Sequence, residues 1–197
     1  MDTVDFYDSN ASQLIDRYNS ADMSALHKLL SAYIPYKGSI LDIGFGSGRD
    51  LQFLYDNNYD IWGIDASAEF VKNVQQRFPD IKEHFMKASI PFDTAEMKLN
   101  KKFDAVIAIA MWMHLKRDEY MKAVKTIISI VKLQSTVIIS FSEGNRSDNE
   151  RYFEEVDLEY ITQVFSNEGF ELIQTIKNKD SLSRESLTWI TVIYRHD

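Results

Sequence analysis

The sequence predicts an α/β protein with N-terminal helices and a doubly wound, seven-stranded, mostly parallel sheet that has an antiparallel last strand. Short apolar segments alternate with amphipathic ones along the chain, a pattern typical of consecutive β-α units. The last two apolar segments, 170–177 and 187–194, are separated by roughly ten residues, too few for a crossover helix. These two strands are therefore expected to pair antiparallel.

The elements follow one another in a regular order. A short helix is expected at 10–18, and a second one begins after Asp22 and ends before Pro35. After these, strands are expected at 39–43, 61–64, 82–86, 103–110 and 136–141, and helices at 49–57, 67–78, 117–131 and 157–167. Residues 103–110 are almost wholly apolar, as expected for a strand buried on both faces.

Composition indicates one domain. The chain has 197 residues, of which 45% are hydrophobic and 26% charged, and no repeat or linker divides it, so we expect a single domain over 1–197. The chain has no cysteine, which excludes disulfides, thiolate metal sites and a cysteine nucleophile, and no metal site is expected. The N-terminus lacks the pattern of a signal peptide, and no apolar run reaches the length of a membrane span. A cytoplasmic protein without a membrane partner is expected.

The charge balance bears on possible partners. Lys and Arg number 22 against 30 Asp and Glu, a net charge of -8. Residues 143–171 alone contain nine acids and two arginines. A field of this sign repels nucleic acid, so a nucleic-acid partner is not expected.

The first strand leads into a glycine-rich turn, Asp42-Ile43-Gly44-Phe45-Gly46-Ser47-Gly48-Arg49. Alternating glycines let the backbone bend sharply and approach a ligand, and the following helix offers free N–H groups. A dinucleotide fingerprint needs G-x-G-x-x-G, but Arg49 stands where its third glycine would be; the Gly-Lys-Ser/Thr of a P-loop is absent. The alternative to a cofactor site is an ordinary tight turn.

This stretch resembles motif I of the class I S-adenosylmethionine-dependent methyltransferases, an acid followed by three alternating glycines. The resemblance implies a Rossmann-like methyltransferase fold, with Asp42 and the turn holding the methionine part of S-adenosylmethionine. Asp65 ends the next strand, and an acid there can accept both ribose hydroxyls. Its alternative role is to cap the helix that begins near Ser67.

The same resemblance assigns further residues to the cofactor. The loop 87–93 lies where the family holds the adenine, with Ile90 and Ala66 expected on its faces. The cofactor-binding set that the resemblance implies is Arg17, Asp42, Gly44, Phe45, Gly46, Gly48, Arg49, Asp65, Ala66, Ser89, Ile90, Ala110 and Met111.

Other segments, among them Gly46-Ser47-Gly48-Arg49-Asp50, Trp112-Met113-His114-Leu115 and Arg151-Tyr152-Phe153, are similar to the TehB-like group of small bacterial methyltransferases. The resemblance spans residues 7–195. It departs from the group at Leu133-Gln134-Ser135, where a Pro-Gly-Gly turn is usual. The group's closing Asp…Arg…Trp pattern corresponds to Asp180, Arg184 and Trp189.

Three residues are candidates for catalysis: His114, Arg184 and Tyr7. His114 is placed to act as a general base, or it packs against the following helix. Arg184, in the last loop, would bind a carboxylate or phosphate of the acceptor, or it pairs with Asp180 at the surface. Tyr7, with Arg17 and Tyr18, lies in a segment (1–35) expected to cover the cofactor as a helical cap, or simply to pack.

The acceptor is expected to be a small molecule. No Asn/Asp-Pro-Pro-aromatic tetrapeptide follows the fourth strand, which weighs against exocyclic DNA amines and glutamine amides, and cytosine C5 methylation needs a cysteine. Two alternatives stay open: methylation of tRNA or another nucleic acid, and binding of S-adenosylmethionine without catalysis. The oligomeric state does not follow from the sequence.

Overall fold

Seven strands form one sheet in the computed structural model, which describes residues 3–95, 97, 99–144, 150–180 and 187–197. The order across the sheet is β3-β2-β1-β4-β5-β7-β6. The strands are β1 (Ser39–Ile43), β2 (Asp60–Asp65), β3 (Phe85–Lys87), β4 (Phe103–Ala108), β5 (Val131–Glu143), β6 (Phe170–Lys179) and β7 (Thr188–His196). Only β7 runs antiparallel to its neighbours, β5 and β6. The predicted fold class is therefore confirmed.

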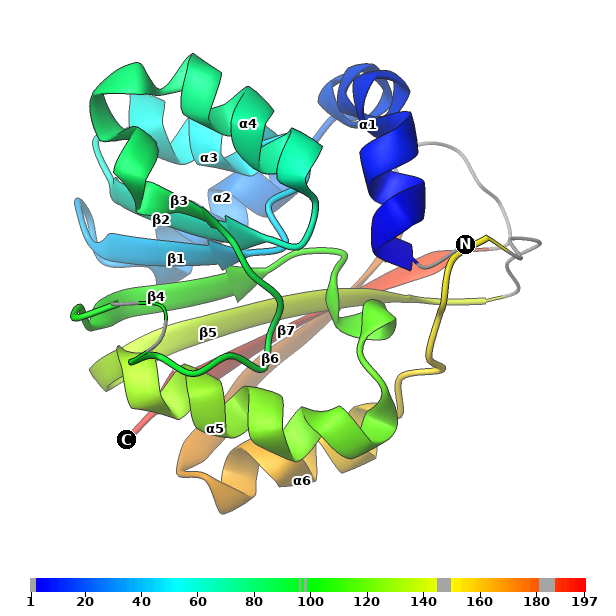
Figure 1. Cartoon of the computed structure of the whole chain (residues 1–197). Coiled ribbons are helices and arrows are strands. Elements are labelled where there is room, and N and C mark those ends of the chain that lie inside the picture. Colours follow the sequence, from blue (N-terminus) through cyan, green and yellow to red (C-terminus); the bar gives the residue numbers. More distant parts are fainter. Residues whose placement is uncertain (1–2, 96, 98, 145–149, 181–186) are drawn as a thin grey trace.

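Helices cover both faces of this sheet (Figure 1). On one side lie α2 (Ser24–Tyr33), α3 (Arg49–Asp56) and α4 (Ala68–Arg77), and on the other lie α5 (Tyr120–Ile130) and α6 (Leu158–Asn167). The first helix, α1 (Thr3–Asn19), lies beside the end of the sheet to which β1, β2 and β4 point.

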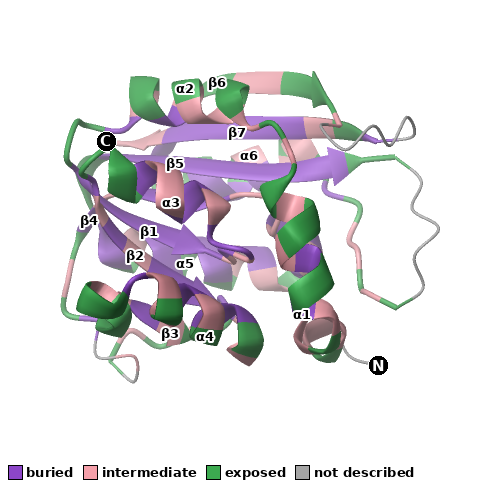
Figure 2. Cartoon of the chain, turned by 90° about the horizontal axis from the view of Figure 1, so that it is seen from above, coloured by how far each residue is buried: buried purple, intermediate pink, exposed green. Residues whose placement is uncertain are grey.

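The two faces bury separate apolar cores because side chains alternate along each strand. In β4, Val106 and Ala108 pack into the core on the α5 and α6 side, whereas Ala105 and Ile107 pack into the core that includes α3 and α4. All four residues are fully buried, and the central strands are purple in Figure 2. The nearly continuous apolar run is thus explained by burial on both faces.

Element ends differ from the prediction by three or more residues at four places. The first helix begins at Thr3 rather than at residue 10. The third strand is only Phe85–Lys87, because Pro79, at the first position of a 3-10 helix, begins a turn that runs to His84. The fifth strand begins at Val131, five residues earlier than expected. Residues 132–134 are exposed and show no apolar alternation, so the sequence did not mark them as part of a strand. A 3-10 turn at Arg117–Glu119 precedes α5.

The sheet topology fixes where a ligand can bind. The chain order reverses between β1 and β4, which are neighbours in the sheet, and the loops that follow them lead to helices on opposite faces. Such a switch point leaves a crevice beyond the carboxyl ends of the strands. Within the described part of the chain, no helix is long and apolar enough to span a membrane.

Candidate active site

The glycine-rich turn follows β1 at this crevice. Gly44, Gly46 and Gly48 have φ angles of +74°, +53° and +70°, a region that favours glycine. A Cβ atom on Gly44 would lie 2.5 Å from Met111 Cγ, and one on Gly48 would lie 2.6 Å from Val74 Cγ2. Glycine is therefore required at positions 44 and 48, where a Cβ atom would clash, and is favoured at position 46 by the positive φ.

Asp65 ties this turn to the next helix. Its carboxylate accepts a hydrogen bond from Gly46 N–H and another from Ser67 N–H, both at 2.8 Å. Asp65 is 8% exposed, and burial raises its pKa to about 6 although the two N–H donors act in the opposite direction. Each carboxylate oxygen has a second lone pair, so the group can accept further donors from a ligand. Ser67 caps α4 through its own hydroxyl, so Asp65 does not serve as the side-chain N-cap.

Two further buried acids, Asp50 and Asp42, lie near the glycine-rich turn. Asp50 accepts hydrogen bonds from Arg49 at 2.9 and 3.2 Å and lies 2.9 Å from His27 Nε2. Burial acts to raise the pKa of Asp50, yet these hydrogen bonds hold it below its usual range. Asp42 is buried, and this burial, with Asp50 and Asp65 nearby, raises its pKa well above the usual range. A cationic ligand beside Asp42 would stabilise the ionised carboxylate.

The first helix is joined to both sides of the crevice. Asp8 accepts a hydrogen bond from Ser67 at 2.5 Å, and the Tyr18 carbonyl accepts one from Arg49 at 3.1 Å. At the other end of the helix, Thr3 Oγ1 accepts a hydrogen bond from Tyr152 N–H at 2.8 Å. These contacts link α1 to the glycine turn, to α4 and to the segment before α6.

The loop after β4 brings His114 to the same place. Ala110, with φ of +58°, donates its N–H to Ser140 at 2.8 Å, and a 3-10 turn, Trp112–His114, follows. Trp112 is fully buried in the core and so anchors this turn. His114 Nε2 lies 2.9 Å from the Tyr7 hydroxyl, and His114 Nδ1 lies 2.8 Å from the Tyr152 carbonyl oxygen.

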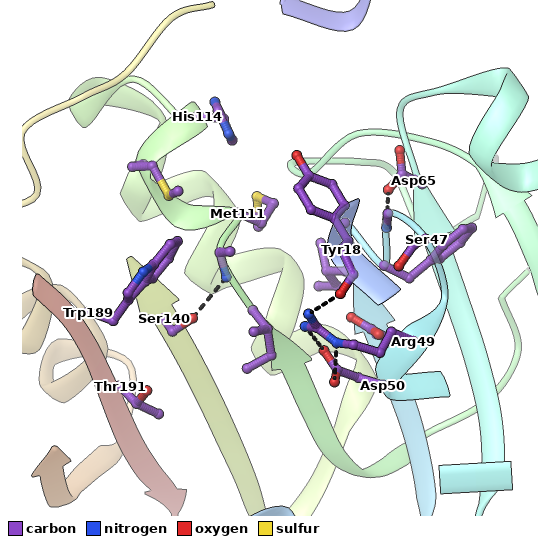
Figure 3. Close-up of a pocket in the computed structure, with 18 of the residues that line it drawn as sticks. Tyr18, Ser47, Arg49, Asp50, Asp65, Met111, His114, Ser140, Trp189 and Thr191 are labelled. Carbon is purple, nitrogen blue, oxygen red and sulfur yellow. Dashed lines mark hydrogen bonds and ion pairs between the residues drawn. The ribbon is translucent and has the colours of Figure 1, made fainter. Parts of the chain in front are cut away.

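One cavity of about 730 Å³ joins these groups (Figure 3). We call the part lined by the glycine turn, Asp42, Asp65 and the loop 87–93 the cofactor half. On the other side, five lining residues share one face of the sheet, and we call them the acceptor wall: Ser140 of β5, Ile176 and Asn178 of β6, and Trp189 and Thr191 of β7. Lys179 and Asp180, at the end of β6, also line the cavity. The strand register pairs Thr191 with both Ser140 and Ile176, and Trp189 with Asn178. Opposed residues, and residues two apart, share a face, so the wall is one surface.

The structure brings most of the predicted site residues together. Those that line the cavity are Tyr7, Asp42, Gly44, Phe45, Gly46, Arg49, Asp65, Ala66, Ser89, Ile90, Ala110, Met111 and His114. Gly48 does not line it and forms the N-cap of α3, and Arg17 is exposed on α1 outside the lining. Arg184 lies outside the described residues. Among the described residues, no cluster of three or more His, Asp or Glu could hold a metal ion.

Thr191, Ile176 and Asn178 were not among the site residues predicted from the sequence. No motif marks them. The available signal was topological: β7 is antiparallel, so its first residues lie at the same edge as the carboxyl ends of the other strands.

A sheet of this order with an antiparallel β7, a glycine turn after β1 and an acid at the end of β2 defines the class I S-adenosylmethionine-dependent methyltransferases. Comparison with known proteins agrees. The chain belongs to the methyltransferase domain family, whose model matches residues 15–189, and it is an S-adenosylmethionine-dependent methyltransferase.

Individual relatives are distant in sequence. An uncharacterized methyltransferase of Staphylococcus carnosus is 21% identical over 95% of this chain and 93% of its own length. A TehB-like methyltransferase structure from Corynebacterium glutamicum is 18% identical, with a TM-score of 0.70 over 96% of this chain and 99% of that one. The Burkholderia thailandensis 1,6-didemethyltoxoflavin-N1-methyltransferase, solved with bound S-adenosylhomocysteine, is 17% identical, with a TM-score of 0.72 over 98% of this chain and 86% of that one.

The residues present fit the cofactor. S-adenosylmethionine carries a cationic sulfonium, an ammonium group and two ribose hydroxyls, and the cofactor half offers two buried carboxyl groups, Asp42 and Asp65, whose pKa values burial has raised. A Cβ atom on Gly46 would meet only the Tyr18 ring, at 3.9 Å, among the described residues, so the turn's backbone is open to a ligand there.

Proposed function

We propose that this chain transfers the methyl group of S-adenosylmethionine to a small molecule bound against the acceptor wall. The observation that carries the proposal is that one cavity of about 730 Å³ contains both the cofactor half and the acceptor wall. This volume lies within the range of about 300–1,000 Å³ typical of small-molecule sites. When bound, the cofactor supplies a methyl group on a sulfonium, a good leaving group, so alignment of the two reactants is the main task left to the protein.

The geometry supports a proposed role for each group in the cofactor half. Asp65 accepts the ribose hydroxyls, Asp42 lies opposite positive charge, and the backbone of the glycine turn faces the methionine part. Ala66, Ser89 and Ile90 line the same half and would enclose the adenine. Arg17 and Arg184 stay predictions, because the first lies away from the cavity and the second outside the described residues.

The acceptor wall supports an acceptor with an uncharged, largely apolar part. Its five residues offer two hydroxyls, an amide, an indole and an aliphatic side chain, and the charged side chains that line the same cavity, among them Lys179 and Asp180, lie outside the wall. Residues 143–171 contain nine acids and two arginines, which disfavours a polyanion such as RNA, and residues 151–153 of this segment line the cavity. The Burkholderia relative of the same fold methylates 1,6-didemethyltoxoflavin, a small molecule.

We further infer that residues 1–35 form a cap over the cavity within one domain. Tyr7 and Tyr18 of α1, and Met23, Leu26 and Leu29 near and in α2, line the cavity. A ligand in the cofactor half would therefore lie between these helices and the sheet.

The test is a transfer assay with tritium-methyl S-adenosylmethionine, run in parallel against a mixed metabolite extract and total RNA. We expect label in small molecules and none in RNA. Label confined to RNA would overturn the small-molecule proposal. Tight cofactor binding by calorimetry without transfer to either pool would instead favour a protein that binds the cofactor without catalysis.

A further inference from the structure

Tyr7 and His114 form a contact between α1 and the loop after β4. The Tyr7 hydroxyl lies 2.9 Å from His114 Nε2, and the two rings meet edge to face with centroids 5.6 Å apart. Both residues line the cavity. A third group, the Arg151 guanidinium, donates to the Tyr7 hydroxyl at 3.3 Å.

The direction of each hydrogen bond follows from the chemistry of the partners. The Tyr152 carbonyl oxygen, 2.8 Å from His114 Nδ1, can only accept, so Nδ1 carries a hydrogen. In a neutral imidazole the other nitrogen, Nε2, is then an acceptor. Tyr7 therefore donates its hydroxyl hydrogen to His114. This direction is the one that a neutral imidazole requires.

This arrangement leaves the Tyr7 oxygen as the route by which a ligand in the cavity can reach His114. Both ring nitrogens of His114 are engaged, so an acceptor can reach the histidine only through the Tyr7 oxygen. That oxygen receives one hydrogen bond from Arg151 and gives one to His114. Among the described residues no other donor contacts it, so one lone pair can accept the proton of an acceptor molecule.

We propose that Tyr7 takes the proton that the acceptor loses on methylation, while the proton of Tyr7 passes to His114. The proposal rests on the proposed function. The acceptor's O–H or N–H bond breaks and its electron pair bonds the methyl carbon, while the pair of the carbon–sulfur bond stays on sulfur. The proton goes to Tyr7 Oη and the former Tyr7 proton to His114 Nε2. The imidazolium, held by the Tyr152 carbonyl, later releases one proton to solvent. Tyr7 is thus the catalytic residue and His114 acts through it as a positioning residue.

Burial supports this assignment. It raises the pKa of Tyr7, and Arg151 only partly opposes the shift, so the phenol keeps its proton at neutral pH and has one to pass on. The relay also specifies the acceptor class: a hydroxyl or amine that loses a proton on methylation. A thioether or a tertiary amine loses none and would gain nothing from it.

The first test needs no acceptor. In the cofactor-free full chain labelled with ¹⁵N-histidine, the His114 signals are identified among four histidines by their loss in His114→Asn. We expect hydrogen on Nδ1 and an unprotonated Nε2 whose resonance shifts in Tyr7→Phe but not in Tyr36→Phe, a matched change at a residue that is 74% exposed. Hydrogen on Nε2, or an Nε2 resonance indifferent to Tyr7→Phe, would overturn the relay.

The second test uses as substrate the unlabelled fraction of the metabolite extract that acquires label in the transfer assay. We expect Tyr7→Phe and His114→Asn each to lower the transfer rate by about 10²–10⁴-fold, with S-adenosylmethionine affinity by calorimetry within about threefold of wild type. The double variant should be no slower than the slower single variant, because the two groups act in series. If His114→Asn does not fold by circular dichroism, His114→Gln replaces it.

The outcomes separate the two proposals. Normal transfer by Tyr7→Phe overturns the relay and leaves the methyltransferase proposal intact. The relay is also overturned if the fold-loss of transfer rate in the double variant equals the product of the two single losses. If the wild-type chain labels no small molecule, the proposed function fails, and the histidine spectra still decide whether the Tyr7–His114 hydrogen bond has the assigned direction.

Discussion

The Ser67 hydroxyl donates a hydrogen bond to the Asp8 carboxylate at 2.5 Å, which joins α1 to the first turn of α4. The same Asp8 oxygen accepts the Glu69 N–H at 3.3 Å. Ser67 lies two residues after Asp65, and its backbone N–H donates a hydrogen bond to the Asp65 carboxylate. The helix proposed to cap the cavity is thus attached next to the group proposed to hold the ribose.

Replacing Asp8 should loosen this attachment. A hydrogen bond to a charged group contributes about 1.5–3 kcal/mol, so Asp8→Ala should speed cofactor dissociation by roughly 10- to 100-fold. It should also speed amide hydrogen exchange in 3–19. The Ser67 cap of α4 is retained through Phe70 N–H, so α4 should stay protected. Stopped-flow release and exchange mass spectrometry measure both, with Asp16→Ala, an exposed position of the same helix, as control. Unchanged release in Asp8→Ala would contradict a cap role.

Removing the Asp65 carboxylate should abolish tight cofactor binding. The ribose hydroxyls lose two charge-assisted hydrogen bonds, and the Gly46 and Ser67 N–H groups lose their shared acceptor. We expect Asp65→Ala to lower the affinity for S-adenosylmethionine, measured by calorimetry, at least about 100-fold. The control is Asp60→Ala, the same change at the other end of β2, where the side chain pairs with Lys101 at the surface. Equal affinity of both variants for the cofactor would show that Asp65 does not bind it.

Affinity should also depend on pH. Asp65 has a pKa of about 6 in the folded cofactor-free protein, against about 3.9 when unfolded, so the folded chain binds more protons between these values. Its stability from this group is present at low pH and falls as pH rises from about 4 to 6, by about 3 kcal/mol in total. A ligand that donates hydrogen bonds to the ionised Asp65 carboxylate offsets this loss of stability.

Cofactor affinity should therefore weaken as pH falls below 6, by up to about tenfold per pH unit for one proton. S-adenosylhomocysteine keeps the ribose but lacks the sulfonium. The pH dependence of its affinity should therefore show the contribution that comes from Asp65. In Asp65→Asn, the fall in the free energy of unfolding between pH 4 and 6 should be reduced, with Asp42 as the remaining contributor of the same sign. An affinity independent of pH between 5 and 7.5 would contradict the assignment.

The sequence predicted the parts of the fold that depend on local pattern. The run 103–108 is buried on both faces, so its apolar composition identified a central strand. The short gap before residue 187 identified the antiparallel ending. The start of β5 was missed because residues 132–134 are exposed at the sheet's end and are not selected for apolar alternation. Gln134, at φ of +60°, also gives no glycine signal.

Candidate site residues were predictable where the backbone favours a residue type or a motif fixes the position. Positive φ angles favour glycine at 44, 46 and 48, and Asp65 was indicated by its place at a strand end. The contact of Tyr7 with His114 was not predictable, because 107 residues separate them and their approach depends on how α1 packs. Thr191 and Ile176 become neighbours only through the register of β6 with β7, which single strands do not encode.

Filling the acceptor half should separate transfer from cofactor binding. Ile176 lies on the acceptor wall opposite Thr191, and Ile176→Trp would occupy space against that wall without touching the glycine turn. We expect S-adenosylmethionine affinity within about threefold of wild type, because the cofactor half is intact, and transfer to small molecules lowered at least about tenfold, a loss of at least about 1.4 kcal/mol in transition-state binding. The matched control is Lys177→Trp, the next residue of the same strand, which is exposed on the other face. It should leave both quantities unchanged. If Ile176→Trp lowers the affinity for the cofactor as much as it lowers the transfer rate, the two halves of the cavity are not separate sites and the acceptor binds elsewhere.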